Sequence, residues 1–326
     1  MNEIDEIDEI DEIGDRLNKV DISSKSYIKP VLKWVGGKTQ IIEQVISQFP
    51  NNINNYYEPF VGGGSILIAL LSSNRISVKG TINAYDKNAS LIYLYKNIQT
   101  NHTELYNTLM EYINEYNSCE DTKENLNRKP TTIEEAKLSK ENYYYWIRNN
   151  YNKLIKTEID SVTVSSLFIF LNKTCFRGLY RTGPNGFNVP FGNYKNPSII
   201  QKDNLIKFSK LIKNVNFEIR DFSIITDNLR ENDFVYFDPP YAPENKNSFV
   251  GYTNDGFTLE HHNKLFNILH NMNEKNYKFV MSNAYVDIIC DEFKNDKYSF
   301  NTILCKRTIN SKNPGIKTKE VIIKNY

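Results

Sequence analysis

Hydrophobic runs and helical patterns alternate along most of the chain. Residues 234–237 are apolar at four consecutive positions, which is typical of a strand buried on both faces of a parallel sheet. Residues 81–85 and 279–283 also predict strands, whereas the apolar spacing of residues 41–46 and 66–71 predicts helices. This alternation predicts an α/β fold with a parallel sheet.

The middle and the end of the chain have other patterns. Residues 88–117 and 132–160 carry Leu, Ile, Tyr and Trp at helical spacing, and the polar stretch between them predicts a surface loop. Residues 242–256 predict a polar loop that closes over a substrate. Residues 302–305 and 321–323 predict a hairpin at the sheet edge. Its connection carries basic residues that would face phosphate if DNA is bound and water otherwise: Lys306, Arg307, Lys312, Lys317 and Lys319.

The first residues form a repeat of their own. Glu-Ile-Asp recurs every three residues to about residue 13, and this period matches neither a helix nor a strand. A segment of acids with little else cannot build a core. Residues 1–27 are therefore predicted to form a disordered acidic tail.

The composition limits the class of protein. With 326 residues, of which 40% are hydrophobic and 24% charged, the chain can bury one large α/β core and a smaller second domain. No apolar run is long enough to cross a bilayer, so a soluble, intracellular protein is predicted. The four cysteines lack the spacing of a zinc site or a disulfide framework, and no metal is expected.

The net charge of +1 hides an uneven distribution. Residues 1–28 hold nine acids and three bases, a net charge of −6, which leaves +7 on the rest of the chain. Residues 172–195 contain four bases and no acid, interleaved with aromatic residues. This pattern fits a nucleic-acid surface and a solvated basic loop about equally well.

The tetrapeptide Asp238-Pro239-Pro240-Tyr241 follows the strand at residues 234–237, at the end where α/β proteins place their chemistry. Two prolines end the strand and make a rigid turn with a carboxylate before it and a ring after it. The ring can stack on a base, while Asp238 and the Pro239 carbonyl accept hydrogen bonds from an exocyclic amino group. A capping Asp at a proline-rich strand end is the other interpretation of these four residues alone.

A glycine-rich turn, Gly62-Gly63-Gly64, connects a strand to the helix at residues 66–71. Glycines let a ligand approach the backbone, and Asp86, at the end of the next strand, can bind two ribose hydroxyls. These features predict a cofactor that contains a nucleoside, with a structural turn as the alternative. Leu67 occupies the third glycine position of the dinucleotide fingerprint, which argues against NAD and against an oxidoreductase.

The first glycine turn of the chain, Gly36-Gly37, lies between Trp34 and Lys38. Gly37-Lys38-Thr39 resembles the end of a P-loop, but the first glycine of that motif and a preceding strand are absent, so a nucleoside triphosphatase is excluded. The turn instead predicts a lysine and a tryptophan that project towards an anionic, flat ligand.

Six stretches of the chain carry a family resemblance: residues 32–38, 58–65, 172–181, 187–192, 238–241 and 320–326. In this order they resemble the DNA adenine methyltransferases of the Dam and DpnM type, over residues 29–326. The resemblance implies a Rossmann-like, seven-stranded methyltransferase sheet with an antiparallel edge hairpin, and S-adenosylmethionine as the methyl donor. It divides the chain into a catalytic domain, residues 28–100 and 215–326, and an inserted helical target-recognition domain, residues 101–214.

The resemblance also implies the roles of individual residues. The catalytic residues would be Asp238, Pro239, Pro240 and Tyr241. The expected cofactor contacts are Trp34, Lys38, Phe60, Gly62, Gly64, Asp86, Asp221, Phe222 and Asp238. The expected DNA contacts are Phe176, Arg177, Leu179, Arg181 and Pro190, with Arg181 reading a base edge.

The recognised sequence stays open. Relatives with this recognition motif commonly recognise GATC. Here Arg177 stands where those relatives carry Asn, and residues 182–186 form a loop one residue shorter than theirs. Because both differences lie in the segment that reads DNA, a related site that contains adenine is as well supported as GATC.

The expected reaction is methylation of the 6-amino group of an adenine flipped out of duplex DNA. Asp238 and the Pro239 carbonyl would hold the amino hydrogens out of the ring plane, so that the nitrogen can attack a sulfonium methyl group without a metal. The alternatives are the cytosine 4-amino group, an RNA adenine, a glutamine side chain, or a sequence-specific DNA-binding protein without catalysis. Double-stranded DNA is the expected partner, and a cognate restriction endonuclease is a further candidate.

Overall fold

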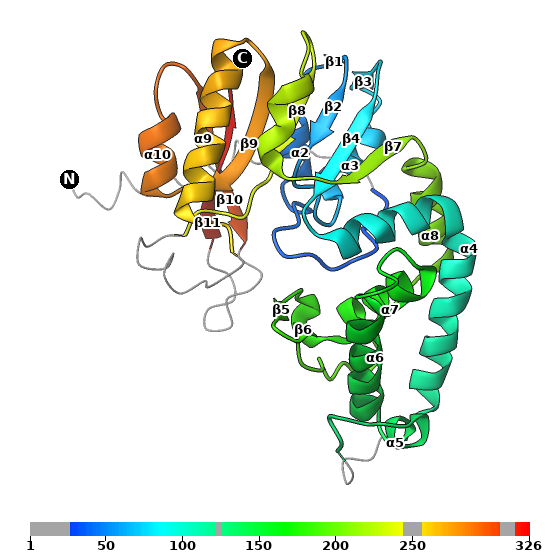
Figure 1. Ribbon diagram of the computed structural model, residues 1–326. Helices are drawn as coiled ribbons and strands as arrows, with labels where there is room; N and C mark the ends of the chain where they lie inside the picture. Colours follow the sequence, from blue (N-terminus) through cyan, green and yellow to red (C-terminus); the bar gives the residue numbers. More distant parts are fainter. Residues whose placement is uncertain (1–26, 121–125, 244–255, 307–316) are drawn as a thin grey trace, which may run out of the picture.

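A seven-stranded sheet forms the centre of the larger lobe (Figure 1). The computed structural model describes residues 27–120, 126–243, 256–306 and 317–326. Strands β9, β8, β2, β4 and β7 pair in parallel, while β11 is antiparallel to both β9 and β10. The predicted sheet and its antiparallel edge hairpin are therefore confirmed. Across the sheet the strands are β10 (Ser299–Lys306), β11 (Lys317–Lys324), β9 (Lys278–Ala284), β8 (Phe234–Phe237), β2 (Tyr56–Glu58), β4 (Ile82–Asp86) and β7 (Val215–Ile219).

Helices cover both faces of this sheet. The α-helices are α2 (Ile42–Ile46), α3 (Ser65–Leu71), α4 (Ala89–Ser118), α5 (Ile133–Lys137), α6 (Lys140–Leu154), α7 (Val162–Thr174), α8 (Lys202–Leu211), α9 (Leu259–Glu274) and α10 (Asp287–Phe293). The short elements are β1 (Asn52–Ile53), β3 (Ser77–Val78), β5 (Thr182–Gly183), β6 (Gly186–Phe187) and the 3-10 helices η1 (Phe176–Gly178) and η2 (Phe222–Asn228).

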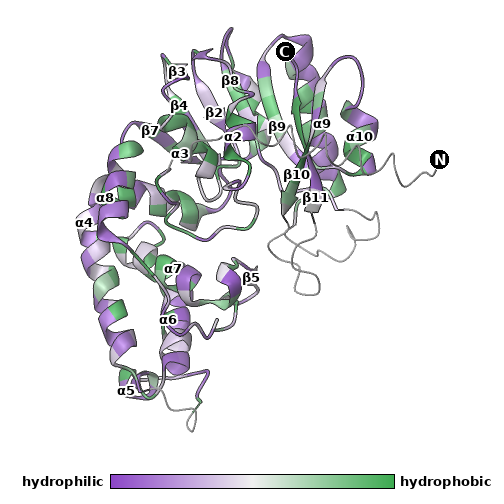
Figure 2. Ribbon diagram, turned by 180° about the vertical axis from the view of Figure 1, so that it is seen from behind, coloured by the Kyte–Doolittle hydropathy of each residue, from purple (hydrophilic) through white to green (hydrophobic). Residues whose placement is uncertain are grey.

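The alternation of side chains along each strand gives the sheet two buried faces. Tyr56 and Tyr236 pack into the core formed with α2, α3 and α4. Tyr57 and Val235, their neighbours in the same strands, pack into a second core with η2, α9 and α10. Helix α3 is hydrophobic over most of its length, whereas α4 and α6 are banded with hydrophilic residues (Figure 2).

Helix α4 links the sheet to a second, helical lobe (Figure 1). It bends at Asn101 (φ −126°), and beyond the bend Ser166 of α7 donates a hydrogen bond to the carbonyl of Leu105 (3.3 Å). Helix α7 is buried along nearly its whole length and forms the centre of this lobe. The bend lies beside the predicted domain boundary at residues 100 and 101, and the division into two domains stays a prediction.

Some predicted boundaries differ from the structure. The helical pattern at residues 132–160 forms two helices, because the Ser139 side chain accepts a hydrogen bond from Asn142 N–H (3.1 Å) and begins α6 anew. Lys306, Lys317 and Lys319 lie within strands β10 and β11 rather than in their connection, because each of the two strands extends beyond its apolar core.

Several predictions concern residues outside the described part of the chain. These are the acidic tail up to residue 26, most of the predicted loop at 242–256, and Arg307 and Lys312. Tyr27, the last residue of the predicted tail, is described, and its hydroxyl donates to Glu43 (2.6 Å). Among the described helices, none has both the length and the apolar character needed to cross a membrane.

Candidate active site

Three acidic residues lie at the carboxyl ends of three adjacent parallel strands. Asp86 and Glu58 are the last residues of β4 and β2, and Asp238 directly follows β8. From β2 the chain continues to β4 on one side, and it later returns to β8 on the other. This edge is therefore the topological switch point of the sheet, where α/β proteins bind their ligands.

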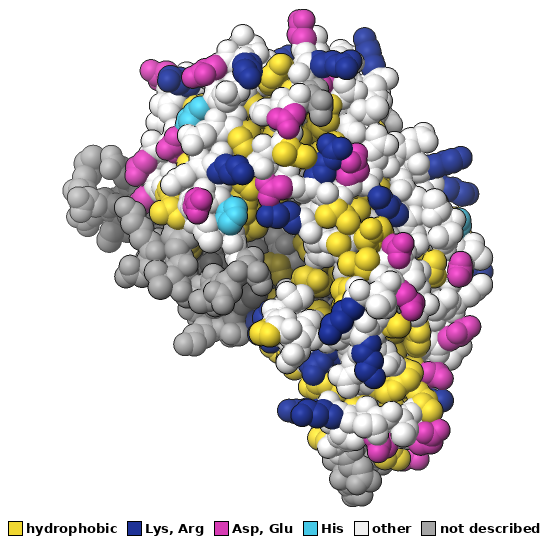
Figure 3. All heavy atoms as spheres, viewed as in Figure 1, with side chains coloured by type: hydrophobic (Ala, Val, Ile, Leu, Met, Phe, Trp, Pro, Cys, Tyr) yellow, Lys and Arg dark blue, Asp and Glu magenta, His cyan; other side chains and the backbone are white. Residues whose placement is uncertain are grey.

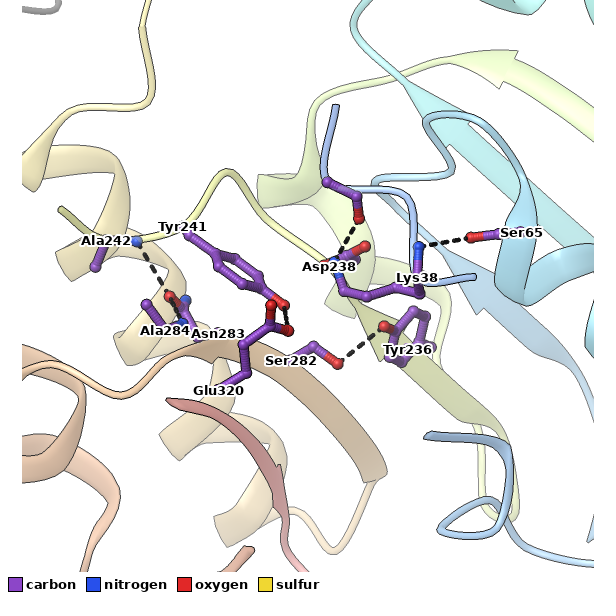
Figure 4. A network of polar contacts seen from close by, with 11 residues as sticks. Lys38, Ser65, Tyr236, Asp238, Tyr241, Ala242, Ser282, Asn283, Ala284 and Glu320 are labelled. Carbon is purple, nitrogen blue, oxygen red and sulfur yellow. Dashed lines mark hydrogen bonds and ion pairs between the residues drawn. The ribbon is translucent and has the colours of Figure 1, made fainter. Parts of the chain in front are cut away.

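Asp238, which is half-buried, forms an ion pair with the buried Lys38 (Figure 4). The Lys38 Nζ lies 2.6 Å from Asp238 Oδ1 and donates a hydrogen bond to the Gly36 carbonyl (2.7 Å). The Lys38 N–H donates to Ser65 Oγ (3.1 Å), which joins the first glycine turn to the start of α3. Burial raises the pKa of Asp238 to about 6, and the neighbouring Lys38 opposes this rise. Two residues predicted from separate motifs are thus brought into direct contact.

Glu58 is a buried acid that the sequence analysis did not single out. Its side chain accepts a hydrogen bond from the Tyr56 hydroxyl (2.8 Å), and the residue is only 2% exposed. Burial raises the pKa of Glu58 to about 8, so its carboxyl group is neutral at pH 7. A signal was present in the sequence, because Glu58 ends a strand just before Pro59, at the edge predicted for Asp86.

The ring of Tyr241 contacts side chains from two distant parts of the chain. The Lys38 Nζ lies 4.6 Å from the ring centroid, in cation–π geometry. The Tyr241 hydroxyl donates a hydrogen bond to Glu320 Oε2 of β11 (2.7 Å; Figure 4). The predicted catalytic tyrosine is thus fixed at its ring and at its hydroxyl, and Glu320 is a further site residue that the sequence analysis missed.

The proline turn has the predicted form. Strand β8 ends at Phe237, after which Pro239 is buried and Pro240 is exposed. Beyond the turn, the Ala242 N–H donates to Asn283 Oδ1 of β9 (3.1 Å). Side chains from β9 and β11 therefore bind consecutive residues of the turn.

The glycine-rich turn after β2 lies against Trp34 and Asp86. Gly62 (φ +48°) and Gly64 (φ +72°) adopt left-handed conformations that favour glycine. A Cβ atom at Gly63 would lie 2.8 Å from the Trp34 side chain. The Gly62 N–H donates to Asp86 Oδ2 (3.1 Å), and burial raises the pKa of Asp86 although this bond lowers it. Four predicted cofactor residues therefore meet in one place.

Three further predicted cofactor residues lie near one another, beside the core formed with η2, α9 and α10. The rings of Phe60 and Phe222 stack, with centroids 5.3 Å apart. Asp221, which caps the start of η2, forms an ion pair with Lys87 (2.8 Å). Partial burial acts to raise the pKa of Asp221, but hydrogen bonds from Lys87 and Ser223 hold it well below its ordinary value.

The predicted DNA-reading segment, residues 176–190, begins with an exposed turn. Phe176 is 44% exposed, and Arg177 is exposed with a left-handed backbone (φ +56°). The Phe176 N–H donates to the Pro190 carbonyl (2.8 Å), which closes the segment into a loop. Leu179 is only half-exposed and packs on the core of the helical lobe.

Arg181 stands beside the small hairpin of β5 and β6. Its Nε donates to Asn188 Oδ1 (2.7 Å), and its terminal nitrogen donates to the Asn188 carbonyl (3.3 Å). The residue is exposed, so its remaining donors face outward. Arg181 therefore braces the hairpin in addition to any contact with DNA.

Asn172 joins the DNA-reading segment to the first glycine turn, and the sequence analysis gave it no role. Its side chain accepts from the Lys33 N–H (2.8 Å) and donates to the carbonyls of Lys33 (2.8 Å) and Gly178 (3.1 Å). Beside this contact, Trp34 stacks on Tyr180 with centroids 5.7 Å apart. The buried amide of Asn172 and the ring pair of Trp34 and Tyr180 thus both help to hold the two predicted ligand-binding regions together.

Charge is unevenly distributed over the helical lobe. Lys and Arg side chains gather over α6 and the hairpin of β5 and β6, while acidic side chains lie along the outer side near α4 (Figure 3). The exposed basic residues of this region include Arg128, Arg177 and Arg181. A basic face that carries the exposed Phe176 suits a polyanion with stacked bases.

Comparison with known proteins agrees with this geometry. A family profile described as D12 class N6 adenine-specific DNA methyltransferase matches residues 34–311. Type II methyltransferase M.MjaIII of Methanocaldococcus jannaschii is 37% identical over 311 residues, which are 92% of this chain and 99% of the relative. Type II methyltransferase M1.LlaDCHI of Lactococcus lactis subsp. cremoris is 29% identical over 93% of this chain and 97% of its own. DNA adenine methylase of Haemophilus influenzae is 28% identical over 94% of this chain and 97% of its own.

The profile spans the first glycine turn, the glycine-rich turn, the helical lobe and the proline turn, which supply most of the residues of the site. It covers well over half of the sequence, and the similar proteins align over nearly their whole length. The chain belongs to the D12 class of N6 adenine-specific DNA methyltransferases.

Proposed function

We propose that the protein transfers a methyl group from S-adenosylmethionine to the 6-amino nitrogen of an adenine flipped out of duplex DNA. The observation that carries this proposal is the group formed by Asp238, Lys38 and Tyr241 at the switch point of the sheet. It combines an ionised acceptor and an aromatic ring beside a glycine-rich turn, which is what a planar amino substrate and a nucleoside cofactor require.

The residues around the glycine-rich turn fit S-adenosylmethionine. The backbone approaches closely at Gly62 and Gly63, where a Cβ atom would meet Trp34. Asp86 would accept hydrogen bonds from the ribose hydroxyls, and the stacked rings of Phe60 and Phe222 would hold the adenine of the cofactor. Bound there, the cofactor supplies an electrophilic methyl group on a sulfonium sulfur.

Asp238 would make the amino group of the target a nucleophile. Its carboxylate and the Pro239 carbonyl would accept the two amino hydrogens, which frees the nitrogen lone pair from the ring. The Lys38 ammonium favours the ionised form of Asp238, and burial makes that carboxylate a stronger proton acceptor than an exposed aspartate. The same carboxylate would stabilise the positive charge that develops on the nitrogen.

Tyr241 and the helical lobe would bind the target. Flipping an adenine costs a few kcal/mol, and stacking on the Tyr241 ring offsets part of this cost. Lys38 covers one face of that ring, so the base would stack on the other. The helical target-recognition domain, residues 101–214, would bind the duplex through its basic face, with Arg177 and Arg181 towards the DNA.

Mapping modified bases in DNA from cells that express the protein tests this function. We expect 6-methyladenine within one short sequence context, and the Asp238→Asn variant should lose about 100-fold or more of its turnover. A calorimetric titration of the variant with S-adenosylhomocysteine checks that its cofactor site is intact. Methylation of cytosine or of RNA instead, or full activity in Asp238→Asn, would overturn the proposal.

A further inference from the structure

We propose that Glu320 is a positioning residue for methyl transfer, because its hydrogen bond to the Tyr241 hydroxyl fixes the ring on which the flipped adenine stacks. The inference rests on the proposed function. It gives the edge hairpin of β10 and β11 a part in the reaction, in addition to completing the sheet.

Glu320 is well placed for this role. It lies in β11, directly opposite Ala284 of β9, and its Oε2 accepts the hydroxyl hydrogen of Tyr241 at 2.7 Å. The residue before Ala284, Asn283, binds the Ala242 N–H through its side-chain oxygen. Figure 4 shows both contacts on the same side of the proline turn. Two neighbouring strands therefore hold Tyr241 and Ala242, one by the side chain and the other by the backbone.

The chemistry of the pair favours a fixed ring. Burial raises the pKa of Tyr241 well above its ordinary value, and Asp238 and Glu320 raise it further, so the hydroxyl stays protonated and donates. A hydroxyl–carboxylate bond is charge-assisted and stronger than a neutral one. The ring also contacts the Lys38 ammonium, whose attraction to an aromatic face constrains the angle of the ring less strictly than a hydrogen bond does.

The neighbours of Glu320 identify which other groups a substitution would disturb. Cys305, on the adjacent strand β10, is buried. Its burial, and to a smaller extent the nearby Glu320, raise the pKa of its thiol to about 12. Asp238 also feels the charge of Glu320, which raises the pKa of that carboxyl. A simple loss of activity in a Glu320 variant would therefore be ambiguous, and the test has to isolate the bond to Tyr241.

A double-mutant cycle isolates that bond. We would measure kcat/KM for methyl incorporation into unmethylated genomic DNA with wild type, Glu320→Ala, Tyr241→Phe and the double variant. Each single change removes one partner of the same bond, so each should lower kcat/KM about 10-fold, which equals ~1.4 kcal/mol. The double variant should be no worse than either single variant. A loss near 100-fold in the double variant would show that Glu320 acts independently of Tyr241 and would overturn the inference.

Two further measurements separate positioning from folding. Glu320→Gln keeps an acceptor oxygen and should recover activity to within about 3-fold of wild type, whereas Glu320→Ala should not. Fluorescence of 2-aminopurine at the target position should show weaker quenching in Glu320→Ala, because the flipped base stacks less well. If Gln fails to rescue, or the quenching is unchanged, the inference is wrong.

Controls distinguish this failure from a failure of the proposed function. Glu292→Ala removes another hydrogen-bonded glutamate, which pairs with His270 on the helical layer of α9 and α10, and should retain activity within about 2-fold. Binding of S-adenosylhomocysteine by Glu320→Ala should match wild type. If wild type itself transfers no methyl group to DNA, the proposed function fails and the inference falls with it.

Discussion

Replacing Glu58 by Gln should stabilise the protein at neutral pH and not in acid. The buried carboxyl of Glu58 has its pKa raised from 4.5 to about 8, chiefly by burial. Because the pKa of Glu58 is higher in the folded state than in the unfolded state, the folded protein is most stable where Glu58 is protonated in both states, below pH 4.5. The free energy of unfolding falls as the pH rises from there through the folded-state pKa of about 8. Glutamine has nearly the same shape, keeps an acceptor for Tyr56, and has no charge to gain.

The size of the effect follows from the two pKa values. At pH 7 the unfolded chain has released the proton of Glu58 while the folded chain still holds it, which costs about 3 kcal/mol of stability. At pH 5 the same cost is only about 1 kcal/mol. The extra N–H group of the amide, if it finds no partner, costs about 1 kcal/mol at either pH. Glu58→Gln should therefore gain about 2 kcal/mol at pH 7 and nothing at pH 5.

Urea unfolding at pH 5, 6 and 7 measures this difference directly. A suitable control is Glu135→Gln, because Glu135 is only half-buried and hydrogen bonds from Thr131 lower its pKa. The Glu135 carboxylate stabilises the fold above its ordinary pKa, and this stabilisation is lost in acid. Glu135→Gln should therefore lower the free energy of unfolding at pH 7, whereas Glu58→Gln should raise it. If the stability difference between Glu58→Gln and wild type is the same at pH 5 and pH 7, the carboxyl titrates normally and the reasoning is refuted.

Three other predictions concern the reaction. Asp86→Ala should weaken S-adenosylmethionine binding by about 1.5 to 3 kcal/mol for each charge-assisted bond lost, and an unchanged dissociation constant in calorimetry would move the ribose elsewhere. The pH profile of kcat/KM should fall about 10-fold per pH unit below pH 6, as Asp238 is protonated; a flat profile down to pH 5 would show that its ionised form is not needed. Arg181→Ala, assayed on a randomised oligonucleotide library, should relax selection at one guanine, a contact that supplies roughly 1 to 3 kcal/mol of discrimination. An even loss over all sequences would leave Arg181 as the brace of Asn188 alone.

The architecture of the site could be predicted from the sequence because it depends on strand ends. Asp86 and Asp238 each follow an apolar run, and parallel strands bring their carboxyl ends to one edge. The glycines at 62 and 64 likewise require a turn at that edge whatever they bind. The family resemblance added the seven-stranded sheet with its antiparallel edge hairpin and the adenine-specific reaction, and membership of the D12 class confirms that reaction.

The contacts inside the site could not be predicted in the same way. Lys38 and Asp238, or Tyr241 and Glu320, meet only after strands far apart in sequence have paired. Hydrophobic periodicity reports which face of an element is buried, not which side chain lies across from it. Glu58 was missed for a related reason, since a motif lists a residue type and does not report its protonation.

The Asn172 side chain has a consequence for efforts to change specificity. It binds the backbone of Lys33, next to the predicted cofactor residue Trp34, and the carbonyl of Gly178, in the predicted DNA-reading segment. A recognition segment transplanted from a relative would bring its own residue at position 172, while the segment around Lys33, with which this residue forms hydrogen bonds, would still be that of the host. Chimeras that exchange residues 172–192 together with the segment around Lys33 would take both partners of these hydrogen bonds from the same protein. The unit to exchange in this enzyme is therefore a pair of segments that are separate in sequence.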